Sequence, residues 1–164
     1  QPYAIWQQQE ALMLVERNGN AIDKFDEKYA GLPLVVGKGA NEHGADIIFL
    51  VGKVPFLQNR VRSFVRIADR RWDLHLNSGI VIRLPDENSG VALKELARLE
   101  EVYNILERDL AVVDLRLNNR LVVSLGEAVV SLDDDAKGVA TSISLKGRNK
   151  LPKNPSKSGR EKKI

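Results

Sequence analysis

The sequence predicts an α+β fold, in which a mostly antiparallel sheet of hairpins packs against two helices and a flexible basic C-terminal tail follows. Three observations support this prediction. Short runs of alternating apolar and polar residues recur along the chain, separated by turns that contain Asn or Gly. One long stretch, 91–108, has apolar residues at spacings of three and four. That helix leads directly into the last hairpin, 111–125, an order typical of α+β domains.

The first third of the chain predicts three strands, at 3–7, 11–17 and 32–36. The Asn-Gly-Asn sequence at 18–20 predicts a hairpin turn, because Gly and Asn tolerate a positive φ, and a short strand returns at 21–22. Pro33 favours the start of a strand or a sheet edge. A helix is predicted near 42–52. Its expected buried stripe consists of Ala45, Ile48 and Phe49.

The middle of the chain predicts a strand at 64–69 and then a second hairpin, in which 72–76 and 80–84 alternate around an Asn-Ser-Gly turn. Asn88 or Ser89 is available as the N-cap of the helix at 91–108. The residues expected on its buried face are Leu93, Leu96, Leu99, Tyr103 and Leu106.

The last hairpin, 111–125, turns at Asn118 and Asn119. Its first run places Val113, Leu115 and Leu117 on one face, and Asp114 and Arg116 on the other. The second run places Leu121, Val123 and Leu125 together. A hairpin this late in the fold is predicted at a sheet edge, where another protein adds a strand, so we expect a recognition function. Residues 128–132 are a candidate further strand, and the edge is usable only if they do not pair with it first.

The charge of the chain is concentrated in its tail. Residues 146–164 hold eight Lys or Arg and one Glu, a net charge of +7, whereas the whole chain has a formal charge of +3. Residues 1–145 therefore carry −4. We expect a domain at 1–132 and a flexible acidic-then-basic tail at 133–164. A tail without aromatic residues or a patterned helix is by default solvated, and the alternative function is binding of nucleic acid or an anionic polymer through it.

No motif in the sequence predicts catalysis, a metal site or a cofactor. The chain has no Cys, and neither His43 nor His75 has a recognisable partner pattern. The Gly-containing segment 36–40 lacks the Gly-Lys-Ser/Thr end of a phosphate loop and is interpreted as a strand-to-helix turn. The acidic run 133–135 lacks the spacing of a calcium loop. From the residues alone, an enzyme is therefore the least favoured class of function.

An ordered set of segments resembles the FtsQ/DivIB family of bacterial cell-division proteins, in its alphaproteobacterial form. The matching segments are Pro-Tyr-Ala-Ile-Trp-Gln at 2–7, Leu-Pro-Leu-Val-Val-Gly at 32–37, Arg-Arg-Trp-Asp-Leu at 70–74, residues 79–85 and Val-Asp-Leu-Arg-Leu at 113–117. The resemblance implies the periplasmic β domain with its tail, and the first residues are similar to the junction with the preceding POTRA domain. It also implies that this domain lies on the periplasmic side of the inner membrane and that a single membrane-spanning anchor stands upstream of the fragment. The absence of an initiator Met agrees with a piece of a longer protein.

The resemblance further implies a divisome scaffold that is not an enzyme. In the family this scaffold binds FtsB, coiled with FtsL, and connects indirectly with FtsW and FtsI during septum formation. In the family the partner is bound by strand addition at the last strands, which here corresponds to Arg120–Leu125. The residues expected to bind the partner are Arg70, Arg116, Leu117, Asn119, Arg120, Leu121, Val122, Val123, Ser124 and Leu125. Enterobacterial members have an aromatic residue in place of Leu117 and a Gly-containing turn after it, so the side-chain anchors are expected to differ here.

Overall fold

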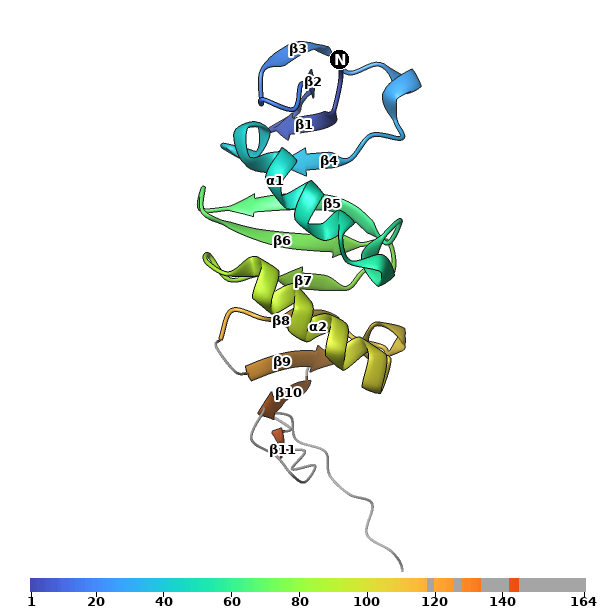
Figure 1. Cartoon of the computed structure of the whole chain (residues 1–164), viewed down its shortest axis with the longest axis vertical. Coiled ribbons are helices and arrows are strands. Elements are labelled where there is room, and N and C mark those ends of the chain that lie inside the picture. Colours follow the sequence, from blue (N-terminus) through green and yellow to red (C-terminus); the bar gives the residue numbers. More distant parts are fainter. Residues whose placement is uncertain (118–119, 126–127, 134–141, 145–164) are drawn as a thin grey trace, which may run out of the picture.

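Eleven strands form one continuous sheet in the part of the chain that the structure describes. This computed structural model describes residues 1–117, 120–125, 128–133 and 142–144. The strands are β1 (Ala4–Gln8), β2 (Ala11–Val15), β3 (Ala21–Lys24), β4 (Leu34–Val36), β5 (Val61–Ile67), β6 (Arg71–Leu76), β7 (Val81–Arg83), β8 (Val112–Asp114), β9 (Arg120–Leu125), β10 (Ala128–Asp133) and β11 (Ser142–Ser144). Their spatial order is β11-β10-β9-β8-β7-β6-β5-β4-β1-β2-β3, and Figure 1 shows this ladder along the long axis.

Most neighbouring strands are antiparallel, as the sequence predicts. The parallel pairs are β1 with β4, β4 with β5, and β7 with β8. The connection between β4 and β5 contains α1 (Ala40–Gly52), and the connection between β7 and β8 contains α2 (Ser89–Tyr103). Three short 3-10 helices are described. η1 (Glu27–Tyr29) precedes β4, η2 (Pro55–Leu57) follows α1, and η3 (Ile105–Glu107) follows α2. Each parallel pair that surrounds a helix is thus joined by a helical crossover.

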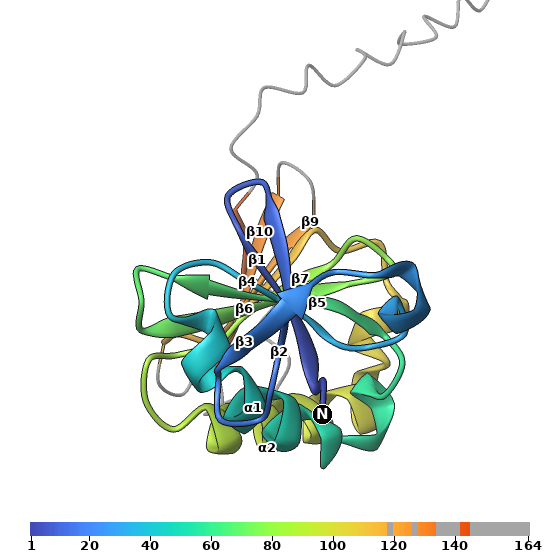
Figure 2. The ribbon, with the colours of Figure 1, turned by 90° about the horizontal axis from the view of Figure 1, so that it is seen from above.

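Both helices lie on one face of the sheet. Figure 2, which looks down the long axis, shows α1 and α2 side by side on that face and the strands fanned out by the twist of the sheet. Among the described residues no helix covers the other face, which we call the open face. An antiparallel sheet with one face packed and one exposed requires alternating apolar and polar residues, which is the pattern of the sequence.

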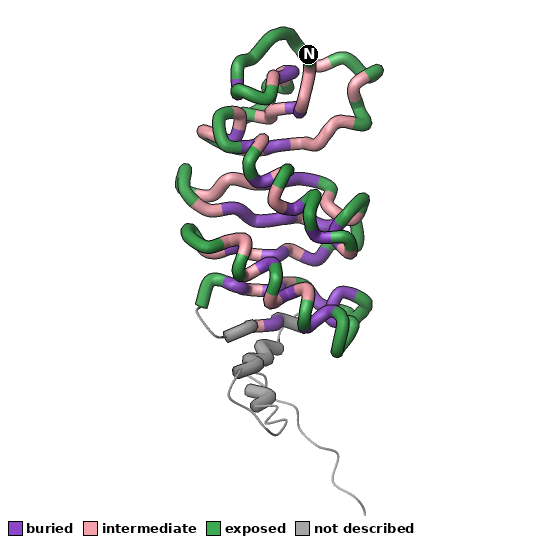
Figure 3. Tube along the Cα trace, viewed as in Figure 1, coloured by how far each residue is buried: buried purple, intermediate pink, exposed green. Residues whose placement is uncertain are grey.

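The core follows one row of residues across seven strands. The residues in register with one another are Trp6, Val35, Phe64, Leu74, Ile82, Val113 and Val123. Apart from the half-buried Trp6, each is 6% exposed or less. Helix residues such as Ile47, Leu93 and Leu96 complete the same cluster. Figure 3 shows these buried residues concentrated in the middle strands.

The predicted strand-to-helix turn at 36–40 is confirmed, and it shows why glycine stands there. Gly37 follows β4 with a φ of 108°, and a Cβ at this position would lie 2.8 Å from the carbonyl oxygen of Arg66. The indole Nε1–H of Trp6 donates to the Gly37 carbonyl oxygen at 2.9 Å. The segment therefore fixes the start of α1 against β1 and β5. Pro33 immediately precedes β4, an interior strand, so of its two predicted roles the strand start is the correct one.

The buried stripe predicted for the first helix is wrong by about one position. Phe49 is 54% exposed, and the buried residues of α1 are Ala40, Gly44, Ile47 and Val51. Gly44 is the reason, because a Cβ there would lie 3.0 Å from the Cγ1 of Val35. The helix turns its glycine toward the sheet to approach closely, and the larger side chains rotate accordingly.

The predicted helix at 91–108 ends earlier than expected. Leu93, Leu96 and Leu99 are buried as predicted, but α2 ends at Tyr103, whose side chain is 45% exposed. Asn104 takes a left-handed conformation and closes the helix. Glu100 is buried, and its carboxylate accepts a hydrogen bond from the backbone N–H of Leu106 at 2.8 Å. Leu106 therefore reaches the core from η3 instead of from the helix.

The last predicted hairpin forms, but its second strand is not an open edge. β8 ends at Asp114, so Leu115 and Leu117 lie beyond the strand, with Leu115 buried and Leu117 55% exposed. β10 pairs antiparallel with all six residues of β9. The candidate strand at 128–132 is thus present, and the expectation of an unpaired edge at Arg120–Leu125 is wrong in this structure.

The predicted boundary at residue 132 falls near the end of β10, and most of the predicted tail lies outside the described residues. Of residues 133–164, the structure describes Asp133, at the end of β10, and the three residues of β11. Among the described helices none combines the length and apolarity needed to cross a bilayer.

Candidate functional site at the C-terminal end of the sheet

A row of charged residues crosses the open face beside the core row. Asp73 of β6 is in register with Arg83 of β7, and Arg83 is in register with Asp114 of β8. The same row continues to Val122 of β9. We call Asp73, Arg83, Asp114 and Arg116 the charged row. Because Asp114 lies on β8, the row places charge next to β9, the strand that the sequence predicts as a partner site.

Asp114 holds Arg116 in a fixed orientation. The guanidinium donates from Nε to Oδ1 at 2.9 Å and from Nη2 to Oδ2 at 2.6 Å, and the Arg116 backbone N–H donates to Oδ1 at 3.1 Å. Arg83 Nη1 lies 3.9 Å from Oδ2. Burial raises the pKa of Asp114, but the hydrogen bonds from Arg116 and the charges of Arg116 and Arg83 outweigh it, so the pKa is lowered overall. Hydrogen bonding to Asp114 likewise raises the pKa of Arg116.

Asp73 lies deeper and is less well paired. The residue is 8% exposed, and its Oδ1 has no hydrogen-bond partner in the described part of the chain, like Nε of Arg71. Burial raises the pKa of Asp73, against the opposing charges of Arg71, Arg83, His75 and Arg116. A buried carboxylate oxygen without a donor costs free energy. The open face therefore carries an unsatisfied acceptor among three arginines.

The structure brings two of the predicted site residues, Arg70 and Arg116, to the same end of the strands. Arg70 Nε forms an ion pair with Asp86 Oδ2 at 3.3 Å, just after β7 ends. The charge of Asp86 also contributes to the raised pKa of Arg116. Both arginines are solvent-accessible, with side chains 64% and 37% exposed. They flank the end of the parallel β7–β8 pair, where β9 begins.

The other predicted partner residues separate into three groups. Leu117 is exposed and lies just beyond β8. Asn119 lies outside the described residues. Residues 120–125 form β9, in which Val123 is buried in the core and Val122 is half-buried in the row of Asp114. The side chain of Val123 is therefore not available to a partner.

Asp73, Arg83 and Arg71 were not predicted as site residues. The sequence signal for Asp73 is the alternation along its strand, which places it on the face of the sheet that points away from the core. Their assembly depends on the parallel register between β7 and β8, across a connection that includes a whole helix. Nothing in a local pattern encodes that register.

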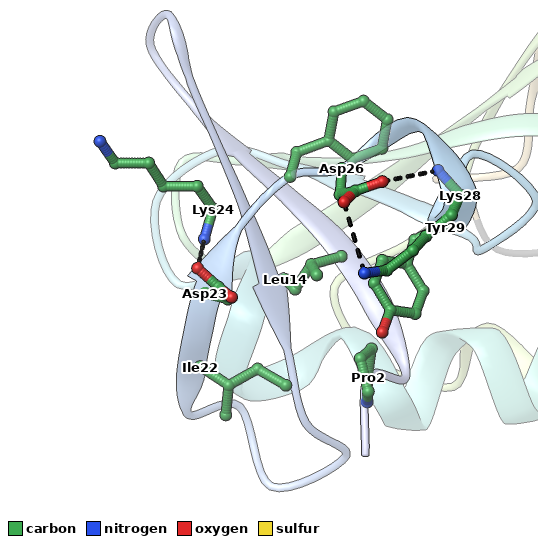
Figure 4. A pocket seen from close by; sticks show the side chains of 9 residues that line it. Pro2, Leu14, Ile22, Asp23, Lys24, Asp26, Lys28 and Tyr29 are labelled. Carbon is green, nitrogen blue, oxygen red and sulfur yellow. Dashed lines mark hydrogen bonds and ion pairs between the residues drawn. The ribbon is translucent and has the colours of Figure 1, made fainter.

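The opposite end of the sheet has a hollow of about 450 Å³ beside β3. Figure 4 shows the hydrogen bonds and the ion pair of its two aspartates, Asp23 and Asp26. Asp26 accepts from the Lys28 backbone N–H at 3.0 Å and lies 3.4 Å from its ammonium group, and Asp23 accepts from the Lys24 backbone N–H at 2.7 Å. The backbone hydrogen bond from Lys28 is the main cause that lowers the pKa of Asp26.

The residues that were considered for chemistry stay apart in the structure. His43 is exposed near the start of α1, and His75 is half-buried on β6 rather than fully solvent-facing. Within the described ranges, no three His, Asp or Glu side chains gather in a way that could hold a metal ion. Of the acidic run at 133–135 only Asp133 is described. The prediction of polymer binding by residues 146–164 falls on residues outside the described part.

Comparisons with known proteins first define the class, which is that of bacterial cell-division proteins. The family described as "Cell division protein FtsQ/DivIB, C-terminal" matches residues 4–116. The chain is 42% identical to the cell division protein FtsQ of Rhizobium radiobacter over 155 residues, which cover 94% of this chain and 72% of that protein. This chain therefore belongs to the FtsQ/DivIB family, which confirms the resemblance read from the sequence.

Further relatives carry the same name. FtsQ of Agrobacterium fabrum is 42% identical over 94% of this chain, and FtsQ of Bradyrhizobium diazoefficiens is 36% identical over 76% of it. The chain spans 48% of the length of the first of these proteins and 37% of the second. It corresponds to part of a longer protein in these relatives.

Proposed function

We propose that this chain is the partner-binding domain of a divisome scaffold, which binds FtsB, together with FtsL, by strand addition along β9. In this proposal the domain is non-catalytic and faces the periplasm, with a membrane anchor elsewhere in the protein. Through FtsB and FtsL it connects indirectly to FtsW and FtsI at the septum. Membership of the FtsQ/DivIB family supports the divisome role.

The observation that supports this partner site is the position of the charged row next to β9, where Asp114 is in register with Val122. β9 supplies Val123 to the core on one face and Val122 to the row of Asp114 on the other. A strand added along β9 would gain backbone hydrogen bonds, while the ordered guanidinium of Arg116 lies at the start of that strand. Backbone pairing supplies affinity, and the charged row supplies register and orientation.

Arg70 and Arg116 are the proposed anchors for acidic side chains of the partner. Each already pairs with an aspartate, so its side chain is ordered before the partner arrives. Such accessible charges act on the association rate and on its salt dependence more than on the lifetime of the complex.

Surface plasmon resonance of this chain with the periplasmic segments of FtsB and FtsL, which gives both the affinity and the association rate, tests the proposal. Arg116→Glu is expected to weaken binding on the order of tenfold, with most of the change in the association rate. Arg62→Glu is the matched control, because Arg62 is also exposed but lies at the opposite end of the central strands. No binding by the unaltered chain, or equal losses in both variants, would contradict the proposed site.

A further inference from the structure

β10 lies where the proposed partner strand would pair. Its six residues match the six residues of β9 without a register shift, from Ala128 opposite Leu125 to Asp133 opposite Arg120. The other side of β9 is occupied by β8. A strand has only two hydrogen-bonding sides, so an added strand can pair with β9 only in place of one of these neighbours.

β8 is not the neighbour that leaves. Val113 of β8 is completely buried in the core and is in register with Ile82 of β7 and Val123 of β9. Removing β8 would open the main core cluster, at a cost comparable to the stability of the whole domain.

β10 is held in a different way. The elements with which it shares extensive contacts are β9 and the three-residue β11. Figure 1 shows that α2 lies over β7 to β9, and that β10 lies beyond it. A strand near the end of a sheet and beyond its covering helices belongs to the least stable part of a fold.

We infer that β10 is a resident strand that covers the partner-binding side of β9 and is displaced when the partner strand binds. This inference rests on the proposed function and adds the regulation of the same site. The exchange replaces the backbone hydrogen bonds between β9 and β10 by those between β9 and the partner strand, so β9 stays paired on both sides. The domain binds its partner only in the fraction of molecules in which β10 is open, and the apparent dissociation constant rises in inverse proportion to that fraction.

A disulfide between β9 and β10 tests the inference directly. The chain contains no Cys, so Ser124→Cys with Val129→Cys introduces a single pair of thiols at positions that are in register. In the oxidised form β10 cannot leave β9. The affinity for the FtsB–FtsL segments is therefore expected to fall by at least about tenfold. Reduction of the same sample restores binding. Met13→Cys with Lys24→Cys is the matched control, because it links β2 to the opposite edge strand, β3, and leaves binding unchanged.

A second variant acts in the opposite direction. Val130→Pro removes a backbone donor from the middle of β10, weakens its pairing with β9 and is expected to increase affinity. Equal binding by the oxidised and reduced forms of the Ser124→Cys, Val129→Cys variant would overturn the inference. A loss of binding in Val130→Pro would also overturn it, because it would show that the partner adds to β10. Failure of the unaltered chain to bind FtsB–FtsL would instead overturn the proposed function.

Discussion

The two ends of the same sheet solve the problem of an exposed strand edge in different ways. At the N-terminal end, β3 has four residues, all exposed, and its pairing with β2 is interrupted by a register shift. The Asp23 carboxylate accepts a hydrogen bond from the backbone N–H of Lys24, so this backbone donor of the edge strand is already occupied. Short length, charge and irregular pairing are the features by which proteins prevent further strand addition.

The C-terminal end has the opposite properties. β9 and β10 have six residues each, pair without interruption and carry valines in their centres. The protection at this end is a further strand of the same chain. One end thus terminates the sheet with a short, irregular strand, whereas at the other end β9 is covered by a strand that we propose a partner displaces. Four predictions test this contrast.

The largest expected effect separates the two ends by their part in the core. Val123→Asp places a charge at a position that is 6% exposed, and we expect a loss of about 3–5 kcal/mol in the free energy of unfolding. Ile22→Asp in β3, at a position that is 44% exposed, should change stability by less than about 0.5 kcal/mol. Urea unfolding measures both. Similar losses would mean that the two ends do not differ in this way.

The next effect concerns the charged row. Asp114→Asn removes the charge that orders Arg116 and is expected to cost about 1–2 kcal/mol at neutral pH. The folded pKa of Asp114 lies below the ordinary value, so this contribution is present above the unfolded pKa, about 4, and is lost as pH falls through the folded pKa. Thermal unfolding against pH should show the two proteins converging in acid. Asp26→Asn, beside β3, should have a smaller effect, because that carboxylate is solvent-exposed.

Asp73→Asn should act in the opposite direction and by less. The folded pKa of Asp73 is raised by burial, so its charge destabilises the fold above the folded pKa, and this cost disappears as pH falls below the unfolded pKa. The variant should therefore melt at a higher temperature than the unaltered protein at neutral pH and lose this advantage in acid. A lower melting temperature at neutral pH would show that the carboxylate is well paired on the open face.

The smallest effect on stability is expected at β3. Asp23→Ala uncovers the Lys24 backbone N–H without disturbing the core and should change the free energy of unfolding by less than about 0.5 kcal/mol. Concentration-dependent association should nevertheless increase, because the edge loses part of its protection. Sedimentation velocity detects it, with Asp46→Ala on the exposed side of α1 as the control for charge. Equal association in both variants would show that Asp23 does not protect the edge.

The sequence was sufficient where neighbouring residues determine the structure. The turn at 18–20, the hairpin of β6 and β7, and the buried face of α2 through Leu99 all depend on local periodicity and turn residues. The buried face of α1 depends on Gly44, which a count of apolar side chains overlooks. Strand endings such as that of β8 at Asp114 are set by the partner strands and not by the residues themselves.

The candidate site was predicted only in part for a related reason. Arg116 and β9 stand out in the sequence, but their neighbours Asp73 and Arg83 depend on a parallel register across a helix. Whether β9 is left open or is covered by β10 is likewise a choice between pairings of similar pattern. Local alternation specifies that each can be a strand and does not specify which one a partner meets.

Amide hydrogen exchange of this chain, alone and with the FtsB–FtsL segments, tests the central claim most directly. The account predicts that on binding the amides of 120–125 stay protected, those of 128–133 exchange faster, and those of β3 do not change. Increased protection of 128–133, or new protection at β3, would contradict the claim that the partner strand replaces β10 beside β9.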